Sequence, residues 1–152
     1  MQELRWNPIL REWVIVASHR KERPVEPSSD RQTSCPFCRG DPHVKGTWEV
    51  KSIPNRLPSL SITAPPKRKT PSRLFKLESS KGFCEVILET KDHETDLGYL
   101  PIERILKVID LFADRFDALG ARQEIRYVYE FRNRGEETGV PVSQPPSQPY
   151  PK

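Results

Sequence analysis

The chain has 152 residues, of which 35% are hydrophobic and 30% charged, and this length and balance predict one globular domain. Its formal net charge of +4 is compatible with a phosphate-bearing ligand, although such a mildly basic balance is more often that of a solvated surface. The apolar runs are no longer than a strand and the N-terminus lacks the pattern of a signal peptide, so the composition predicts no membrane span and a cytoplasmic protein.

Three segments in the N-terminal part are predicted to be strands. Residues 12–18 are mostly β-branched and predict a buried strand, and a loop rich in proline and charge follows over residues 19–34. A short strand over residues 47–53 ends at Pro54, and residues 82–90 form the third strand. The segments show no internal repeat.

One long helix is predicted over residues 101–120. Pro101 suits its first turn, and Gly120 stands where a C-terminal cap is expected. Apolar side chains recur at helical spacing, which predicts a face packed against the core. The members of this stripe are Ile102, Ile105, Leu106, Ile109, Phe112, Phe116 and Leu119.

The chain returns to a strand after the helix. Residues 124–131 alternate between apolar and polar, which predicts a half-buried antiparallel strand. Several strands, one long helix and a further strand predict an α+β fold, with a mostly antiparallel sheet and the helix on one face. The last twelve residues contain five prolines, so this tail is predicted to be extended.

Cys35 and Cys38 form a C-x-x-C pair, whose spacing lets two thiolates bind one zinc ion. No thioredoxin-like context surrounds the pair, so a redox role is less favoured. The total of three cysteines is odd, which favours a metal clip in a cytosolic protein over a secreted disulfide scaffold. A closed site needs two more ligands, and the histidines downstream are His43 and His93, each of which alone is more often a surface residue.

Three loops carry polar residues suited to phosphate binding. Each follows a predicted strand, where loops usually deliver binding residues. Arginines three residues apart suit charge-assisted hydrogen bonds to phosphate, and glycines allow close approach of the backbone. The same residues are equally typical of solvated turns, so the pattern leaves both interpretations open. The members are His19, Arg20 and Arg23 in the first loop, Asn55 and Arg56 in the second, and Asn133, Gly135 and Gly139 in the third.

Five separated segments keep a fixed order along the chain. They read RWNPILREWVIVASHRKERP from residue 5, CPFC from residue 35, IPNRLPSL from residue 53, GFCEVILETKDH from residue 82 and FRNRGEETG from residue 131. In this order the chain resembles the galactose-1-phosphate uridylyltransferases, a family of the histidine-triad superfamily of nucleotidyl transferases and hydrolases. The resemblance extends over essentially the whole chain and corresponds to the N-terminal half of the family's enzyme. We therefore expect the second, related domain to be absent.

The resemblance implies an α+β fold whose antiparallel sheet forms a half-barrel. It also implies a dimeric enzyme that exchanges uridylyl groups between UDP-glucose and galactose 1-phosphate. That exchange runs through a uridylylated histidine, because an imidazole nitrogen attacks the α-phosphorus and a second sugar phosphate displaces the nucleotide. Hydrogen-bond donors aimed at the phosphoryl oxygens stabilise the charge that develops during transfer.

Site residues follow from the resemblance position by position. It implies that three zinc ligands are Cys35, Cys38 and His93. Residues around the uridine diphosphate are Arg20, Arg23, Asn55, Arg56, Val86, Asn133 and Gly139, although Arg56 stands where many members have an acidic residue. Gln148 corresponds to a glutamine that hydrogen-bonds the phosphoryl group in transfer.

The closing loop departs from the family pattern. That pattern reads His-Pro-His, a small residue and Gln, in which the first histidine is the fourth zinc ligand and the second is the nucleophile. This chain has Gln144-Pro145-Pro146-Ser147-Gln148, and Pro141 replaces a common serine. Pro146 has no side-chain nitrogen to attack phosphorus, and Gln144 is a poor zinc ligand, for which water or His43 would substitute. We therefore expect a uridylyltransferase-like domain over residues 1–140 and an altered loop with a frayed tail over residues 141–152.

Three functions compete on these grounds. The first is an N-terminal galactose-1-phosphate uridylyltransferase-like domain that is inactive alone because Pro146 occupies the nucleophile position. The second is a non-catalytic module that binds UDP-sugars or serves in assembly. The third, a zinc-containing nucleic-acid binder, is suggested by the basic loop over residues 65–73 and by the cysteine pair, but no aromatic residues interleave with those basic residues as a stacking platform requires. We expect a UDP-sugar or uridine nucleotide as the partner, and neither nucleic acid nor membrane.

Overall fold

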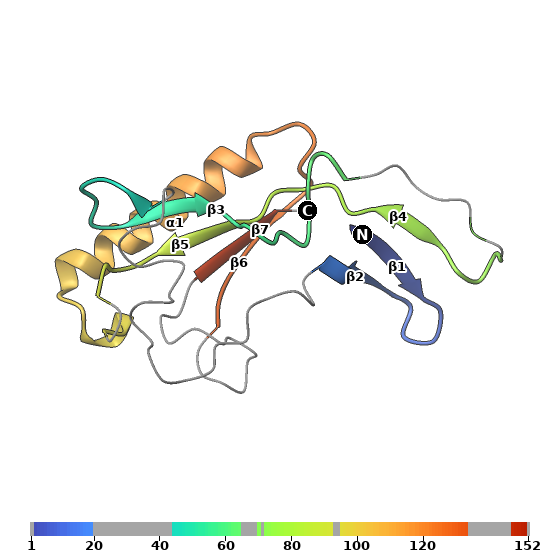
Figure 1. The fold of residues 1–152 in the computed structure, drawn as a ribbon, viewed down its shortest axis with the longest axis horizontal. Helices are drawn as coiled ribbons and strands as arrows, with labels where there is room; N and C mark the ends of the chain where they lie inside the picture. Colours follow the sequence, from blue (N-terminus) through green and yellow to red (C-terminus); the bar gives the residue numbers. More distant parts are fainter. Residues whose placement is uncertain are drawn as a thin grey trace.

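The computed structural model describes residues 2–19, 44–64, 70, 72–92 and 95–133, and the backbone of residues 147–151. Its elements, in order, are β1 (Gln2–Asn7), β2 (Glu12–Ala17), β3 (Lys51–Pro54), β4 (Leu77–Ser79), β5 (Glu85–Leu88), the short 3-10 helix η3 (Leu97–Tyr99), α1 (Ile102–Gly120), β6 (Val128–Arg132) and β7 (Ser147–Pro151). The strands form two antiparallel sheets, ordered β2-β1-β4 and β3-β5-β7-β6, and α1 lies along the second (Figure 1). The predicted α+β class is confirmed.

The first sheet is built on the hairpin of β1 and β2. Asn7 ends β1, and its Oδ1 accepts hydrogen bonds from the backbone N–H groups of Ile9 (3.0 Å) and Leu10 (3.2 Å), which turns the chain. Trp6 and Trp13 face each other across the two strands, with ring centroids 5.5 Å apart in a T-shaped arrangement. The turn and the aromatic pair together set the register of the hairpin.

Strand β2 is confirmed, but its predicted burial is wrong. β2 is at the edge of the first sheet, and Val14 and Ile15 on its opposite faces remain 42% and 38% exposed. A run of β-branched residues favours a strand because of side-chain shape, and that preference does not specify which neighbours cover the strand.

Strand β5 is more deeply buried than β3 and β6, the other strands of the second sheet whose side chains are described. Ile87 is 0% exposed and shares a face with Glu85, which contacts α1. Val86 and Leu88 point to the opposite face, where they form a buried cluster with Val44 and Ile53. Both faces of this strand are therefore covered.

Helix α1 is held on the sheet by apolar packing and by an ion pair. Val108 and Leu119 are buried at 1% exposure each. Arg115 Nε and Nη2 donate hydrogen bonds of 2.7 Å to the two carboxylate oxygens of Glu85. This bidentate geometry orients the helix as well as neutralising the carboxylate.

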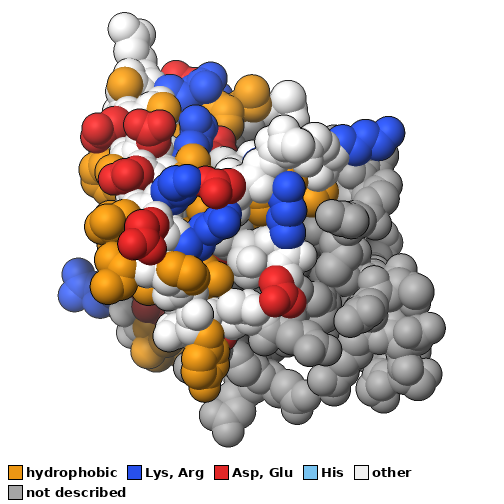
Figure 2. All heavy atoms as spheres, turned by 90° about the vertical axis from the view of Figure 1, so that its left-hand side faces the viewer, with side chains coloured by type: hydrophobic (Ala, Val, Ile, Leu, Met, Phe, Trp, Pro, Cys, Tyr) orange, Lys and Arg blue, Asp and Glu red, His pale blue; other side chains and the backbone are white. Residues whose placement is uncertain are grey.

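Most of the apolar stripe of α1 does not pack in the core, so that part of the prediction is wrong. Among its members only Leu119 is buried, and Ile105 and Phe112 are half-buried. The exposed members are Ile102, Leu106, Ile109 and Phe116. Seen from the side on which α1 begins, the surface carries hydrophobic side chains beside charged ones (Figure 2). Helical periodicity identifies an apolar face, but the width of the sheet decides how much of that face is covered.

Residues 147–151 of the proline-rich tail form β7, which lies between β5 and β6. Its pairing with β6 extends from Ser147 to Pro151, whereas its pairing with β5 is through Ser147 alone. A strand in the middle of a sheet must donate hydrogen bonds to a neighbour on each side, and proline has no backbone N–H to donate. The prolines of β7 therefore limit its pairing with the second neighbour, β5. Within the described ranges, no helix combines the length and apolarity needed to cross a membrane.

Truncation of Ile87 and of Ile102 should have opposite consequences. Ile87→Ala should lower the free energy of unfolding by about 2–5 kcal/mol, because it opens a cavity in the core. Ile102→Ala should change it by no more than about 0.5 kcal/mol, because the side chain is 72% exposed. Urea unfolding followed by circular dichroism measures both. A large loss for Ile102→Ala would mean that this face of α1 is covered in solution.

Candidate functional site

The loop after β3 is fixed by Asn55. Its backbone N–H donates to the carbonyl of Cys84 at 2.9 Å, and its side-chain Oδ1 accepts from the N–H of Leu57 at 3.0 Å. Such an Asn-centred turn reverses the chain directly after the strand. Asn55 is half-buried, and the neighbouring Arg56 is exposed at the surface.

The carbonyl of Pro58 joins this loop to the first sheet. It accepts a hydrogen bond of 2.6 Å from Gln2 Nε2, and His19 Nε2 lies 3.0 Å away. Because a carbonyl only accepts, His19 Nε2 carries the hydrogen in this contact. His19 begins the first of the three polar loops, so the first and second polar loops predicted from the sequence meet at Pro58.

Val86 and Gln148 neighbour the one residue pair that joins β5 to β7. Ile87 pairs with Ser147, and Val86 precedes Ile87 while Gln148 follows Ser147. Gln148 in turn pairs with Phe131 of β6. Val86 is only 2% exposed, within the apolar cluster on the face away from α1.

Asn55 and Asn133 lie at opposite edges of the same sheet. Asn55 follows the end of β3, which pairs with the start of β5, and Asn133 follows the end of β6, which pairs with the start of β7. Since β5 and β7 are antiparallel neighbours, these two strand ends lie at opposite edges. The four residues of β5 span about 13 Å at the usual rise of a strand.

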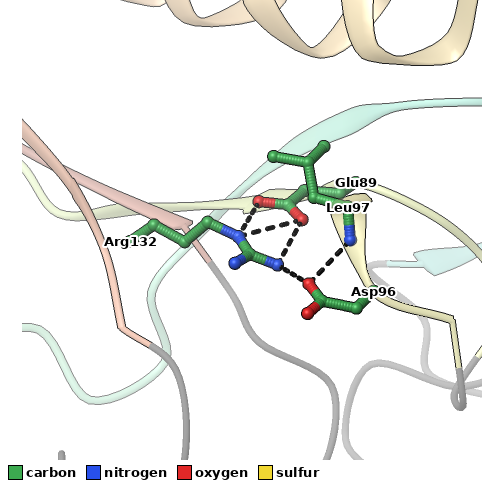
Figure 3. Close-up of polar contacts among 4 residues, drawn as sticks. All are labelled: Glu89, Asp96, Leu97 and Arg132. Atoms are coloured by element: carbon green, nitrogen blue, oxygen red, sulfur yellow. Dashed lines mark hydrogen bonds and ion pairs between the residues drawn. The ribbon is translucent and has the colours of Figure 1, made fainter. Parts of the chain in front are cut away.

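A cluster of ion pairs lies directly before Asn133. Arg132 Nε donates to both carboxylate oxygens of Glu89, at 2.9 and 3.3 Å, and its Nη2 donates to Glu89 at 3.2 Å and also to Asp96 (Figure 3). Asp96 Oδ1 also accepts from the backbone N–H of Leu97 at 2.7 Å and so caps η3. The guanidinium thus joins the end of β6 to the segment after β5.

Burial and charge act against each other at Arg132. Burial lowers its pKa, but the hydrogen bonds and charges of Glu89 and Asp96 outweigh burial and raise the pKa above its ordinary value. The side chain of Glu89 is only 4% exposed. Removing the guanidinium would leave this buried carboxylate unpaired, which costs about 3–5 kcal/mol in comparable cases.

Glu130, two residues before Arg132, differs from it because burial alone shifts its pKa. Its Oε1 is buried and has no hydrogen-bond partner within the described part of the chain. Burial therefore raises the pKa of Glu130 above its ordinary value.

Several residues predicted for the site lie outside the described residues. They are Arg20, Arg23, Cys35, Cys38, His43, His93, Gly139, Gln144 and Pro146, and of Gln148 only the backbone is described. The described ranges contain no group of three or more His, Cys, Asp or Glu side chains that could hold a metal. The zinc site expected from the sequence therefore remains a prediction. The remaining cysteine, Cys84, is buried, and its Sγ accepts from the N–H of Leu60 at 3.4 Å.

The structure brings forward three residues that sequence analysis missed: Glu89, Asp96 and Arg132. The alternation predicted over residues 124–131 places Arg132 with the polar side chains, on the face expected to meet solvent, where a charge needs no partner. No local signal therefore pointed to these ion pairs.

Comparison with known proteins supports the resemblance seen in the sequence. A family model described as galactose-1-phosphate uridyl transferase, N-terminal domain, matches residues 1–151. The chain is 37% identical over 150 residues to the galactose-1-phosphate uridylyltransferase of Thermotoga maritima, covering 99% of the chain and 46% of that protein. A solved uridylyltransferase structure superimposes with a TM-score of 0.79 at 30% identity, covering 97% of the chain and 45% of the other.

A second activity occurs among the relatives. The ADP-glucose phosphorylase of Arabidopsis thaliana is 26% identical over 165 residues, covering 96% of the chain and 47% of that protein. Its crystal structure with bound ADP-glucose superimposes with a TM-score of 0.65 at 25% identity, covering all of the chain and 49% of the other. The chain spans about half the length of the curated relatives it matches.

Proposed function

The chain belongs to the galactose-1-phosphate uridyl transferase family, and on that premise we propose that it binds a UDP-sugar without forming the covalent uridylyl-enzyme. The observation that carries this proposal is Pro146, which stands where the family pattern has its nucleophilic histidine. A proline side chain has no nitrogen lone pair, so no residue at this position attacks the α-phosphorus. The residues assigned to binding and orienting the nucleotide are retained. The chain therefore binds the nucleotide although it lacks the group that would form the covalent bond.

Nucleotide binding is supported by the arrangement of the second sheet. Val86 and the backbone of Gln148 neighbour the Ile87–Ser147 pair that joins β5 to β7, and Asn55 and Asn133 follow strands that end at opposite edges of the sheet. A sheet with polar residues at both edges suits an extended ligand such as a nucleotide sugar. We assign to the same ligand Arg20, Arg23, Arg56 and Gly139, on the resemblance alone.

We also propose a zinc ion held by Cys35, Cys38 and His93. Two thiolates and one imidazole are ligands that zinc prefers, so the donor set fits the metal. A structural zinc contributes to folding by joining segments that are distant in sequence. Gln144 is a weak fourth ligand, so water or His43 completes the shell.

The names of the relatives indicate different nucleotide bases, uridine for one and adenine for the other. Uridine is the stronger candidate, because the galactose-1-phosphate uridylyltransferase relative shares 37% identity and the ADP-glucose phosphorylase relative 26%. An adenine nucleotide sugar is the second candidate, since the solved relative holds ADP-glucose. We further propose that the protein acts in the cytoplasm on soluble nucleotide sugars rather than on nucleic acid.

UDP-glucose should bind saturably, and more tightly than ADP-glucose. Isothermal titration calorimetry with each nucleotide sugar measures both affinities directly. The reverse preference would favour the adenine alternative, and the absence of heat with both ligands would contradict nucleotide-sugar binding altogether.

Incubation with UDP-glucose labelled in its uridine should leave the chain unlabelled. The double substitution Gln144→His with Pro146→His should restore labelling, towards about one uridylyl group per chain, because it supplies the imidazole nucleophile. Gln144→His alone is the matched control and should stay unlabelled. Stoichiometric labelling of the unaltered chain would refute the proposal. A doubly substituted chain that binds UDP-glucose but takes no label would mean that Pro146 is not what prevents transfer.

Zinc should co-purify with the chain at about one ion per chain when chelators are omitted. Cys38→Ser should remove most of it, because the substitution deletes a thiolate ligand. Cys84→Ala is the matched control and should keep the metal, since Cys84 is buried in contact with Leu60. Metal analysis by mass spectrometry distinguishes these outcomes, and an unaltered chain free of zinc would contradict the site.

A further inference from the structure

The cluster of Glu89, Asp96 and Arg132 lies at the base of the altered loop. Arg132 is the last residue of β6, and it pairs in register with Ser147, the first residue of β7. Ser147 also pairs with Ile87 of β5. The segment between Arg132 and Ser147 thus leaves and rejoins the sheet at one place, and the ion pairs lie at that place.

The ion pairs tie together segments that the backbone ladder joins only weakly. The described pairing of β5 with β7 consists of one residue pair, Ile87 with Ser147. Arg132 reaches past β7 and holds Glu89, which directly follows β5, by three hydrogen bonds. Asp96, held by the same guanidinium, fixes the start of η3. One side chain therefore sets the relative positions of β5, β6 and η3.

A guanidinium suits this task better than an ammonium group. Its planar fork satisfies two carboxylates at fixed angles, so it orients its partners as well as neutralising them. Lysine would keep the charge but would hold the carboxylates without fixed geometry. Replacing the arginine by lysine therefore keeps the positive charge and removes the fixed geometry, so the effect of the substitution reports on orientation.

We propose that Arg132 is a positioning residue for nucleotide binding, whose contacts with Glu89 and Asp96 hold Asn133 and the Ser147–Gln148 backbone in place for the ligand's phosphates. This inference rests on the proposed UDP-sugar binding. Arg132 itself touches no ligand in this role and acts through Asn133, its neighbour in the chain, and through the Ser147–Gln148 backbone, with which β6 pairs. In this proposal Arg132 and Ser147, which lie at the base of the altered loop, are held in place although the loop has proline at the nucleophile position.

The chain offers a matched control in the pair of Arg115 and Glu85. This pair is also bidentate, with both bonds at 2.7 Å, and its arginine is similarly buried, with 29% of the side chain exposed against 24% for Arg132. Arg115 belongs to α1 and is distant in sequence from Asn133. If both pairs were only structural, their arginine-to-lysine variants would affect the ligand alike.

The test is a double-substitution cycle on UDP-glucose affinity, measured by calorimetry on the full chain. Arg132→Lys and Asn133→Ala should each weaken binding by about tenfold, the usual effect of losing a hydrogen bond to a charged group. The combined variant should be weaker than Asn133→Ala alone by much less than tenfold, because much of the effect of Arg132 passes through Asn133 and the rest through the Ser147–Gln148 backbone. Arg115→Lys should stay within about twofold of the unaltered chain. Independent, multiplying effects of the two substitutions, or an equal loss in Arg115→Lys, would overturn the proposal.

Hydrogen exchange provides a second measurement that needs no ligand. Arg132→Lys should speed exchange at the amides of Ser147 and Gln148, and Arg115→Lys should leave them protected. If the unaltered chain bound no UDP-glucose, the proposed function would fail, and the exchange result would still decide whether Arg132 positions this segment. Unchanged protection at Ser147 and Gln148 in Arg132→Lys would refute the positioning role.

Discussion

Two glutamates flank the buried strand β5, and the arrangement of the second sheet depends on how their charges are matched. Glu85 begins the strand and binds Arg115 of α1, whereas Glu89 directly follows the strand and binds Arg132 of β6. Between them Ile87 is fully buried. A carboxylate in such surroundings is tolerated only when a cation pairs with it. Helix α1 and strand β6 are therefore held by charge as well as by apolar contact.

The proposed function separates a binding frame from the transfer chemistry. The frame consists of the sheet pairings and ion pairs of the described residues, which do not include positions 144 and 146. The proposal assigns nucleotide binding to this frame and the absence of transfer to Pro146.

The elements of the chain were predictable to different degrees. The helix predicted over residues 101–120 matches α1 almost to the residue, because local spacing decides most of it. The predicted ends were one residue off, since Pro101 is the N-cap and Ala121, not Gly120, is the C-cap. Strands β1 and β4 were missed, since β1 is largely polar and β4 has only three residues. Strand β7 was hidden by its prolines, which are rare within sheets. For the site, the resemblance identified Asn55, Val86, Asn133 and Gln148 as candidates, and the structure describes their positions in one sheet.

The sequence by itself determined the family, the one long helix and the presence of proline at position 146, because each of these depends on residue identity or local spacing. Tertiary structure alone decided that β2 is an edge strand, that most of the apolar stripe of α1 is exposed, and that Arg132 pairs with Glu89. Those features depend on which surfaces meet after folding. Glu89 and Arg132 are 43 residues apart, and no local pattern encodes the contact between them.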